Sequence, residues 1–110
     1  MPFLNIVTNS QIDDEAALIK AASQTVSQAS GKPETYVMVT VQSQNMSMSG
    51  EQGPAAFLDY RSLGLPSERA AFSDALCSMI NQQLGINGDR IYIGMTDSAR
   101  QDWGWNHATF

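Results

Sequence analysis

The alternation of β-forming and helical segments repeats once along the chain, and this repeat restricts the possible folds more than any other feature. A run of β-forming residues at 3–8 comes first. Acidic side chains from Asp13 then begin a helical pattern, with apolar residues three and four positions apart, and Gly31 ends it. A nearly continuous apolar run at 36–42 follows, which predicts a strand buried on both faces. The first half therefore predicts strand, helix, strand.

The second half has the same order of elements. A polar stretch at 43–54, interrupted by glycine and proline, separates the halves as a long loop or an irregular hairpin. We expect a third strand at 55–61, a helix with Ser67 as its N-cap and Gly85 after its last turn, and a fourth strand at 91–96. Because each helix ends at a glycine before a strand that bears a tyrosine, the halves look like one unit used twice.

These elements predict an α+β fold, a pseudo-duplicated βαβ domain over residues 1–110 with a four-stranded mixed sheet and both helices on one face. Connections of this length favour parallel, right-handed pairing within each half. The helix positions expected in the core are Ile12, Ala16, Ile19, Ala22, Val26 and Ala29 in the first helix and Phe72, Leu76, Met79, Ile80 and Leu84 in the second.

The other face of this sheet has no segment left to cover it, and the C-terminal tail at 103–110 is apolar. An uncovered apolar sheet face is unfavourable in water. We therefore expect an oligomer in which subunits bury one another's sheets.

Charge and residue usage exclude several classes of function. Six basic against eleven acidic side chains give a net charge of -5, which disfavours nucleic acid and anionic membrane surfaces as partners. The single cysteine, Cys77, and the single histidine, His107, support neither a disulfide nor a cysteine- or histidine-rich metal centre. No phosphate-binding glycine loop, CxxC or HExxH pattern occurs in the chain. Without a basic, apolar leader, the expected location is the cytoplasm, with signal-independent export left open.

Pro2 carries the most specific chemical implication. If Met1 is removed, the chain begins with a rigid secondary amine, whereas proline inside a chain has a non-basic amide nitrogen. An α-amino group has a pKa of about 8, and burial or a nearby cation lowers it, so such an amine serves as a general base near neutral pH. Chains that begin Met-Pro are common, however, and Pro2 alone is equally compatible with no catalytic role.

Three other candidates also have purely structural interpretations. The ammonium of Lys32, which follows the helix-ending glycine, is suited to hold a carboxylate, but a lysine there also interacts favourably with the helix dipole. Tyr36 and Tyr92, both expected on strands, offer ring faces and phenolic donors to an aromatic substrate. Tyrosines on strands more commonly pack in the core with a hydrogen-bonded hydroxyl.

Four blocks of sequence together resemble one known family. They are residues 1–6 (Met-Pro-Phe-Leu-Asn-Ile), 29–36 (Ala-Ser-Gly-Lys-Pro-Glu-Thr-Tyr), 89–93 (Asp-Arg-Ile-Tyr-Ile) and 104–110, where Gly-Trp-Asn precedes a final Thr-Phe. In this order and spacing they resemble the macrophage migration inhibitory factor family of the tautomerase superfamily. The resemblance implies a βαβ-repeat monomer and a homotrimer with active sites between subunits.

The resemblance also implies roles for individual residues. Pro2 would be the general base of a keto–enol tautomerase acting on 2-oxo acids such as phenylpyruvate, without metal or organic cofactor. Lys32 would bind the substrate carboxylate together with the backbone near Leu63, and Tyr92 would come from the neighbouring subunit. The aromatic pocket would be shaped by Tyr36, Trp105 and Phe110.

The sequence departs from the family at three places. Residues 55–58 are Ala-Ala-Phe-Leu where animal members have a CxxC pair, which excludes thiol oxidoreductase chemistry at that position. Gly94 stands where members often have a pocket asparagine, so turnover of ring-hydroxylated substrates and of dopachrome stays open. Trp103 replaces an aliphatic pocket residue and is expected to narrow or lengthen the site.

Two alternatives to the enzyme stay open. One is a cytokine-like signalling protein that binds a protein receptor and keeps the pocket only as a vestige. The other is a structural trimer without a ligand. The physiological substrate is not determined by the sequence.

Overall fold

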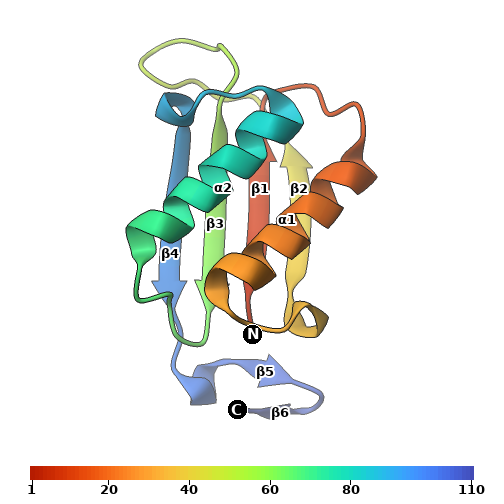
Figure 1. Cartoon of the computed structure of the whole chain (residues 1–110), viewed down its shortest axis with the longest axis vertical. Helices are drawn as coiled ribbons and strands as arrows, with labels where there is room; N and C mark the ends of the chain where they lie inside the picture. The colour runs from red at the N-terminus through yellow and green to blue at the C-terminus, as the bar shows by residue number, and fades with distance from the viewer.

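The computed structural model describes all 110 residues and contains one four-stranded sheet with two long helices (Figure 1). The sheet order is β2–β1–β3–β4, with β1 parallel to β2, β3 parallel to β4, and β1 antiparallel to β3. The elements are β1 (Phe3–Thr8), α1 (Glu15–Ser30), β2 (Met38–Ser43), β3 (Ala56–Ser62), α2 (Arg69–Leu84), β4 (Ile91–Asp97), β5 (Gly104–Trp105) and β6 (Ala108–Thr109), with 3₁₀ turns η1 (Glu34–Tyr36), η2 (Gly88–Arg90) and η3 (Arg100–Asp102).

Both helices cover the same face of the sheet, as the sequence predicts, and the core lies between the two layers (Figure 1). Burial alternates along β1 and β3, because successive side chains of a strand point to opposite faces. The predicted mixed sheet and the repeated strand–helix–strand unit are confirmed. Neither helix is long and apolar enough to cross a membrane.

The prediction that 36–42 is a strand buried on both faces is wrong. Tyr36 belongs to the turn η1, and β2 begins only at Met38. β2 is an edge strand, and its side chains Met38, Thr40 and Gln42 are exposed on the face without helices. A continuous apolar run cannot distinguish a central strand from an edge strand, because burial depends on neighbours distant in sequence.

The helix limits and faces also differ in detail from the prediction. α1 begins at Glu15, and the carboxylate of Asp14 accepts a hydrogen bond from the Ala17 amide as its N-cap. Its buried residues are Leu18, Ala22 and Val26, whereas the predicted core residue Ala16 is exposed. In α2 the N-cap is Glu68 rather than Ser67, and no side-chain cap bond forms. The predicted positions of α2 are buried apart from Leu84, which is half-buried.

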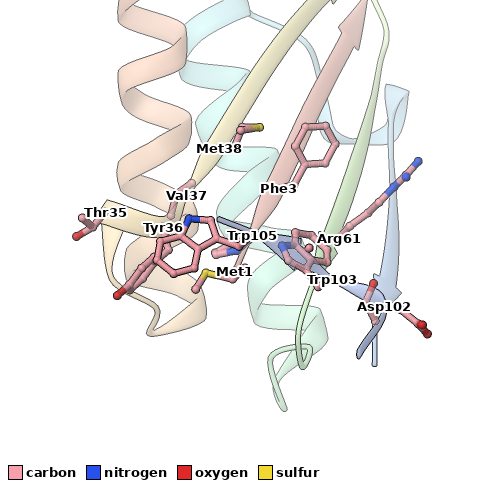
Figure 2. Close-up of a pocket in the computed structure, with 13 residues that line it drawn as sticks. Met1, Phe3, Thr35, Tyr36, Val37, Met38, Arg61, Asp102, Trp103 and Trp105 are labelled. Atoms are coloured by element: carbon pink, nitrogen blue, oxygen red, sulfur yellow. The ribbon is translucent and has the colours of Figure 1, made fainter. Parts of the chain in front are cut away.

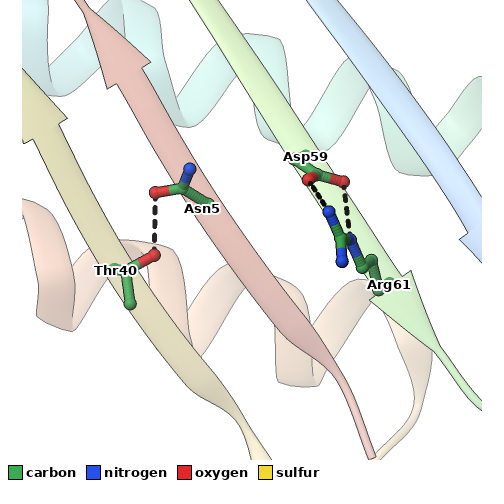
Figure 3. Close-up of polar contacts among 4 residues, drawn as sticks. All are labelled: Asn5, Thr40, Asp59 and Arg61. Carbon is green, nitrogen blue, oxygen red and sulfur yellow. Dashed lines mark hydrogen bonds and ion pairs between the residues drawn. The ribbon is translucent and has the colours of Figure 1, made fainter.

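The sheet face without helices carries polar side chains at its centre (Figure 3). The hydroxyl of Thr40 on β2 donates a hydrogen bond to the side-chain oxygen of Asn5 on β1 at 2.8 Å. On β3 the guanidinium of Arg61 pairs with the carboxylate of Asp59 at 2.8 Å. Exposed aromatic side chains, Phe57 and Tyr92, lie beyond this polar centre. The face is therefore amphipathic and open to solvent in the single chain.

The loop 43–54 is held by two side chains rather than by regular secondary structure. The guanidinium of Arg90 donates hydrogen bonds to four loop carbonyls, those of Met48, Glu51, Gly53 and Pro54. The amide of Asn9 donates to further loop carbonyls and accepts from the amide of Ala55 at 2.9 Å. These hydrogen bonds offset part of the conformational entropy that the loop loses when it becomes ordered.

Replacing Arg90→Gln removes most of these donors. The Pro54 carbonyl then loses its hydrogen bond, whereas the carbonyls of Met48, Glu51 and Gly53 each keep one other donor. We expect the free energy of unfolding, measured by urea denaturation, to fall by about 2 kcal/mol. The amides of Met48 and Glu51, which bond to each other's carbonyls, should also exchange hydrogen faster. The control is Arg69→Gln at an exposed helix position, where we expect a change below about 0.5 kcal/mol. An equal loss of unfolding free energy in the two variants would contradict the role of Arg90 in holding the loop.

Candidate active site

A cavity of about 620 Å³ lies at the amino end of β1 (Figure 2). It is bounded by the start of β1, the segment from η1 into β2, the end of β3, and the C-terminal segment after β4. The side chains that line it are Met1, Pro2, Phe3, Thr35, Tyr36, Val37, Met38, Arg61, Ser98, Asp102, Trp103 and Trp105, together with Gly104. Of the predicted site residues, the cavity brings together Pro2, Tyr36, Trp103 and Trp105.

Pro2 lines this cavity and is buried. Its side chain is less than 2% exposed, and its carbonyl accepts a hydrogen bond from the amide of Met38 at 3.0 Å. Within an extended strand, the nitrogen and carbonyl of one residue point to the same side, so the Pro2 nitrogen faces the β2 side of β1. Proline has no N–H to satisfy there, and this burial leaves no amide donor unpaired.

Lys32 is positioned by the end of α1. Gly31 adopts the left-handed conformation, with φ of 75°, and turns the chain back toward the sheet. The Ser27 hydroxyl donates to the Lys32 carbonyl at 2.7 Å, and the Lys32 ammonium donates to the Leu63 carbonyl at 2.8 Å. One of the three ammonium donors is therefore occupied, and Lys32 and Leu63 form a pair beside the cavity rather than within its lining.

The N-terminal amine lies close to this lysine. Burial first, and the positive charge of Lys32 second, lower the pKa of the Met1 amine from its ordinary value. Both effects disfavour the ammonium form. The end of the chain is thus an environment in which an amine is more readily neutral than in water.

Aromatic side chains form much of the cavity wall (Figure 2). Tyr36 comes from η1, and Trp103 and Trp105 come from the segment after β4. Phe110 does not line this cavity, but its ring stacks on that of Trp105, with 6.0 Å between the ring centroids. The β5–β6 hairpin that carries these residues turns at Asn106 and His107, which both adopt positive φ. His107 is exposed on this turn.

Tyr92 does not reach this cavity in the single chain. It lies near the start of β4, at the opposite end of the sheet, directly across from Phe57 of β3. Phe57 and Tyr92 line a second hollow of about 380 Å³ with Met46 and Met48 of the loop. A Cβ atom at Gly94 would lie 3.2 Å from the Phe57 ring, so any larger residue at this position would crowd that ring.

The sequence did not indicate several residues of the cavity. No sequence motif marks Phe3, Met38 and Arg61, although they lie side by side on the open sheet face, as the register Phe3↔Met38 and Phe3↔Arg61 shows. The alternation of buried and half-buried residues along β1 places the Phe3 side chain on the sheet face away from the helices. Asp102 lay in no recognised motif. The structure contains no group of three or more His, Cys, Asp or Glu side chains that could hold a metal ion.

A family model described as macrophage migration inhibitory factor (MIF) matches residues 1–110. Macrophage migration inhibitory factor of Rattus norvegicus is 32% identical, over 100% of this chain and 99% of the relative. The crystal structure of the homologue from Prochlorococcus marinus is similar with a TM-score of 0.91 and 36% identity, over 98% of each chain. The MIF-like protein of Entamoeba histolytica gives a TM-score of 0.93 at 28% identity, over 99% of this chain and 98% of that one. On the match over its whole length, the chain belongs to the macrophage migration inhibitory factor family, with the fold of the tautomerase superfamily.

Proposed function

We propose that this chain is a cofactor-independent keto–enol tautomerase of phenylpyruvate-type 2-oxo acids, with the amine of Pro2 as the general base after Met1 is removed. The family fold supports isomerase-type chemistry in general. The observation that supports the assignment of Pro2 is its burial in a cavity with aromatic walls, and the lowered pKa of the Met1 amine, caused by burial first and by Lys32 second, agrees with it. Pro2 lines the same cavity as Met1, so burial would lower the pKa of an amine at Pro2 in the same direction.

The proposed reaction moves one proton within the substrate. The neutral amine of Pro2 removes a proton from the carbon next to the keto group, and the C–H electron pair becomes the carbon–carbon double bond of the enol. The carbonyl oxygen gains negative charge and takes the proton back from the resulting ammonium. The two free donors of the Lys32 ammonium would hold the substrate carboxylate, next to the Leu63 carbonyl that occupies the third.

The aromatic residues of the cavity fit the remainder of such a substrate. A phenyl ring is apolar, and Tyr36, Trp103 and Trp105 offer aromatic surface on the wall of the same cavity as Pro2. Phe110 would restrict the movement of the Trp105 ring through their stacking. We propose that these residues bind the ring while Lys32 binds the carboxylate, which orients the reacting carbon toward Pro2.

We extend the proposal to a homotrimer. Met38, Phe57 and Tyr92 are 62%, 42% and 64% exposed on a sheet face that nothing in the chain covers. Tyr92 lies away from the Pro2 cavity of its own chain, so it would contribute to the cavity of a neighbouring subunit. Sedimentation equilibrium should give a particle mass three times that of the chain. A mass equal to one chain would mean that Tyr92 does not contribute to the proposed site.

A signalling role is the alternative, because the curated relatives bear the name of a cytokine. In that case a protein receptor would bind the outer surface, and the pocket would be a vestige. Variants of Pro2 would then bind the receptor with unchanged affinity.

The substitution Pro2→Gly tests the general base. It replaces the rigid secondary amine by a flexible primary one, and we expect kcat/KM for phenylpyruvate to fall about 100-fold. The assay follows enol absorbance. Intact mass spectrometry must first show that Met1 is absent from both proteins, and a retained Met1 would by itself eliminate Pro2 as the base.

The substitution Lys32→Ala tests the electrostatic role of the lysine. A base with a lowered pKa stays neutral to lower pH, so kcat/KM falls only when the pH drops through that pKa. Removing the nearby positive charge raises the pKa of the amine, and the acid limb of the pH–rate profile should move to higher pH. KM should rise about 10-fold through loss of the carboxylate contact.

Lys20→Ala is the matched control, since Lys20 lies exposed on the same helix. We expect its profile and its KM to equal those of the unmodified protein. An acid limb that does not move in Lys32→Ala would refute the assigned role of the ammonium.

A further inference from the structure

One peptide group beside the cavity is hydrogen-bonded on both of its sides. It joins Leu63 to Gly64 in the turn that follows β3. Its carbonyl, on Leu63, accepts a hydrogen bond from the Lys32 ammonium at 2.8 Å. Its N–H, on Gly64, donates to the side-chain oxygen Oδ1 of Asp97 at 2.9 Å. A lysine and an aspartate are therefore connected through a single peptide group, which we call the bridging peptide.

The geometry of a peptide group couples these two hydrogen bonds. A trans peptide is planar, and its C=O and N–H point to opposite sides of the chain. An acceptor that fixes the direction of the Gly64 N–H thus also fixes the direction of the Leu63 carbonyl. Gly64 has a positive φ of 80°, which glycine adopts without steric strain, so the turn holds this orientation at no cost from a side chain.

Asp97 is fixed relative to this turn by the sheet. It is the last residue of β4 and pairs with Ser62, the last residue of β3. The backbone amide of the next residue, Ser98, donates to the Ser62 carbonyl at 3.0 Å. The end of β4 therefore holds the turn at two points, one before Leu63 and one after it.

The ammonium of Lys32 has no other partner in the chain. The Lys32 backbone is held at the end of α1, where its carbonyl accepts from the Ser27 hydroxyl at 2.7 Å and its amide donates to the Ser30 hydroxyl at 3.2 Å. The ammonium itself forms no ion pair, and its one hydrogen bond goes to the Leu63 carbonyl. Because the lysine stem is long and flexible, the position of its charge depends on the bridging peptide.

This arrangement holds the lysine without neutralising it. A carboxylate in direct contact with the ammonium would occupy its donors and offset its charge. The Asp97 carboxylate acts instead through the peptide, where hydrogen bonds in a chain polarise and strengthen one another. Two donors and the positive charge of Lys32 therefore remain available at the edge of the cavity.

We propose that Asp97 is a positioning residue, which orients the bridging peptide and thereby directs the Lys32 ammonium toward the substrate carboxylate. This inference rests on the proposed function in the role given to Lys32. Asp97 does not line the cavity and is assigned no contact with the substrate. Its effect on the reaction passes only through the bridging peptide.

The substitution Asp97→Ala removes the acceptor of the Gly64 amide. At a pH above the acid limb of the pH–rate profile, we expect KM for phenylpyruvate to rise about fivefold, because the ammonium that binds the carboxylate is less well oriented. We expect kcat to change less than about twofold, since Asp97 does not line the cavity that contains Pro2. A merely structural role would lower the folded fraction, and hence the apparent kcat, without raising KM.

Two further variants serve as comparisons. Asp97→Asn is the conservative variant, because its side-chain oxygen can still accept from the Gly64 amide, and KM should stay within about twofold of that of the unmodified protein. Asp89→Ala is the matched control, because it removes an exposed aspartate next to the other end of β4, and its kinetics should be unchanged. Unchanged KM in Asp97→Ala, or an equal rise in either comparison variant, would overturn the inference.

NMR tests the same geometry without any turnover. In Asp97→Ala we expect the Gly64 amide to exchange hydrogen about tenfold faster, and the ¹⁵N-detected signal of the Lys32 ammonium to weaken as its protons exchange faster with water. Unchanged exchange at both groups would also overturn the inference. If the unmodified protein does not turn over phenylpyruvate but both NMR changes occur, the proposed activity fails and the positioning of Lys32 by Asp97 stands.

Discussion

The antiparallel pairing of β1 with β3 joins the two repeated units and brings distant parts of the chain together. Each unit by itself contains only a parallel strand pair and one helix. When β1 runs beside β3 in the opposite direction, the beginning of one strand meets the end of the other. Phe3 pairs with Arg61 for this reason, and Lys32, just after the end of α1, reaches the Leu63 carbonyl that follows β3. The candidate site is thus a direct result of sheet topology.

The sheet also explains why the amine environment is unusual. A chain terminus normally frays into water, where an ammonium is well solvated. Here the first residues enter a central strand, and the start of the chain lines a cavity together with η1, the ends of β2 and β3, and the C-terminal segment. Desolvation and a fixed cation act together on a group that would otherwise titrate as in a peptide.

Periodicity and helix-ending glycines were sufficient to predict the order of the main elements, because each is a local signal. The burial of β2 and the role of Ser67 were mispredicted, since edge position and cap geometry depend on tertiary context. Short sequence blocks pointed to Pro2, Tyr36 and the two tryptophans, which the fold does collect in one cavity. No local sequence signal marks Arg61 and Asp102, because only the cross-strand register and the final 3₁₀ turn bring them to the cavity.

The C-terminal hairpin contributes walls to the cavity but no residue to the buried core. Side chains such as Trp105 are therefore free to vary in size without disturbing the packing of the two layers. Substitutions in the hairpin would reshape the cavity wall, whereas substitutions between the helices and the sheet would change the stability of the fold.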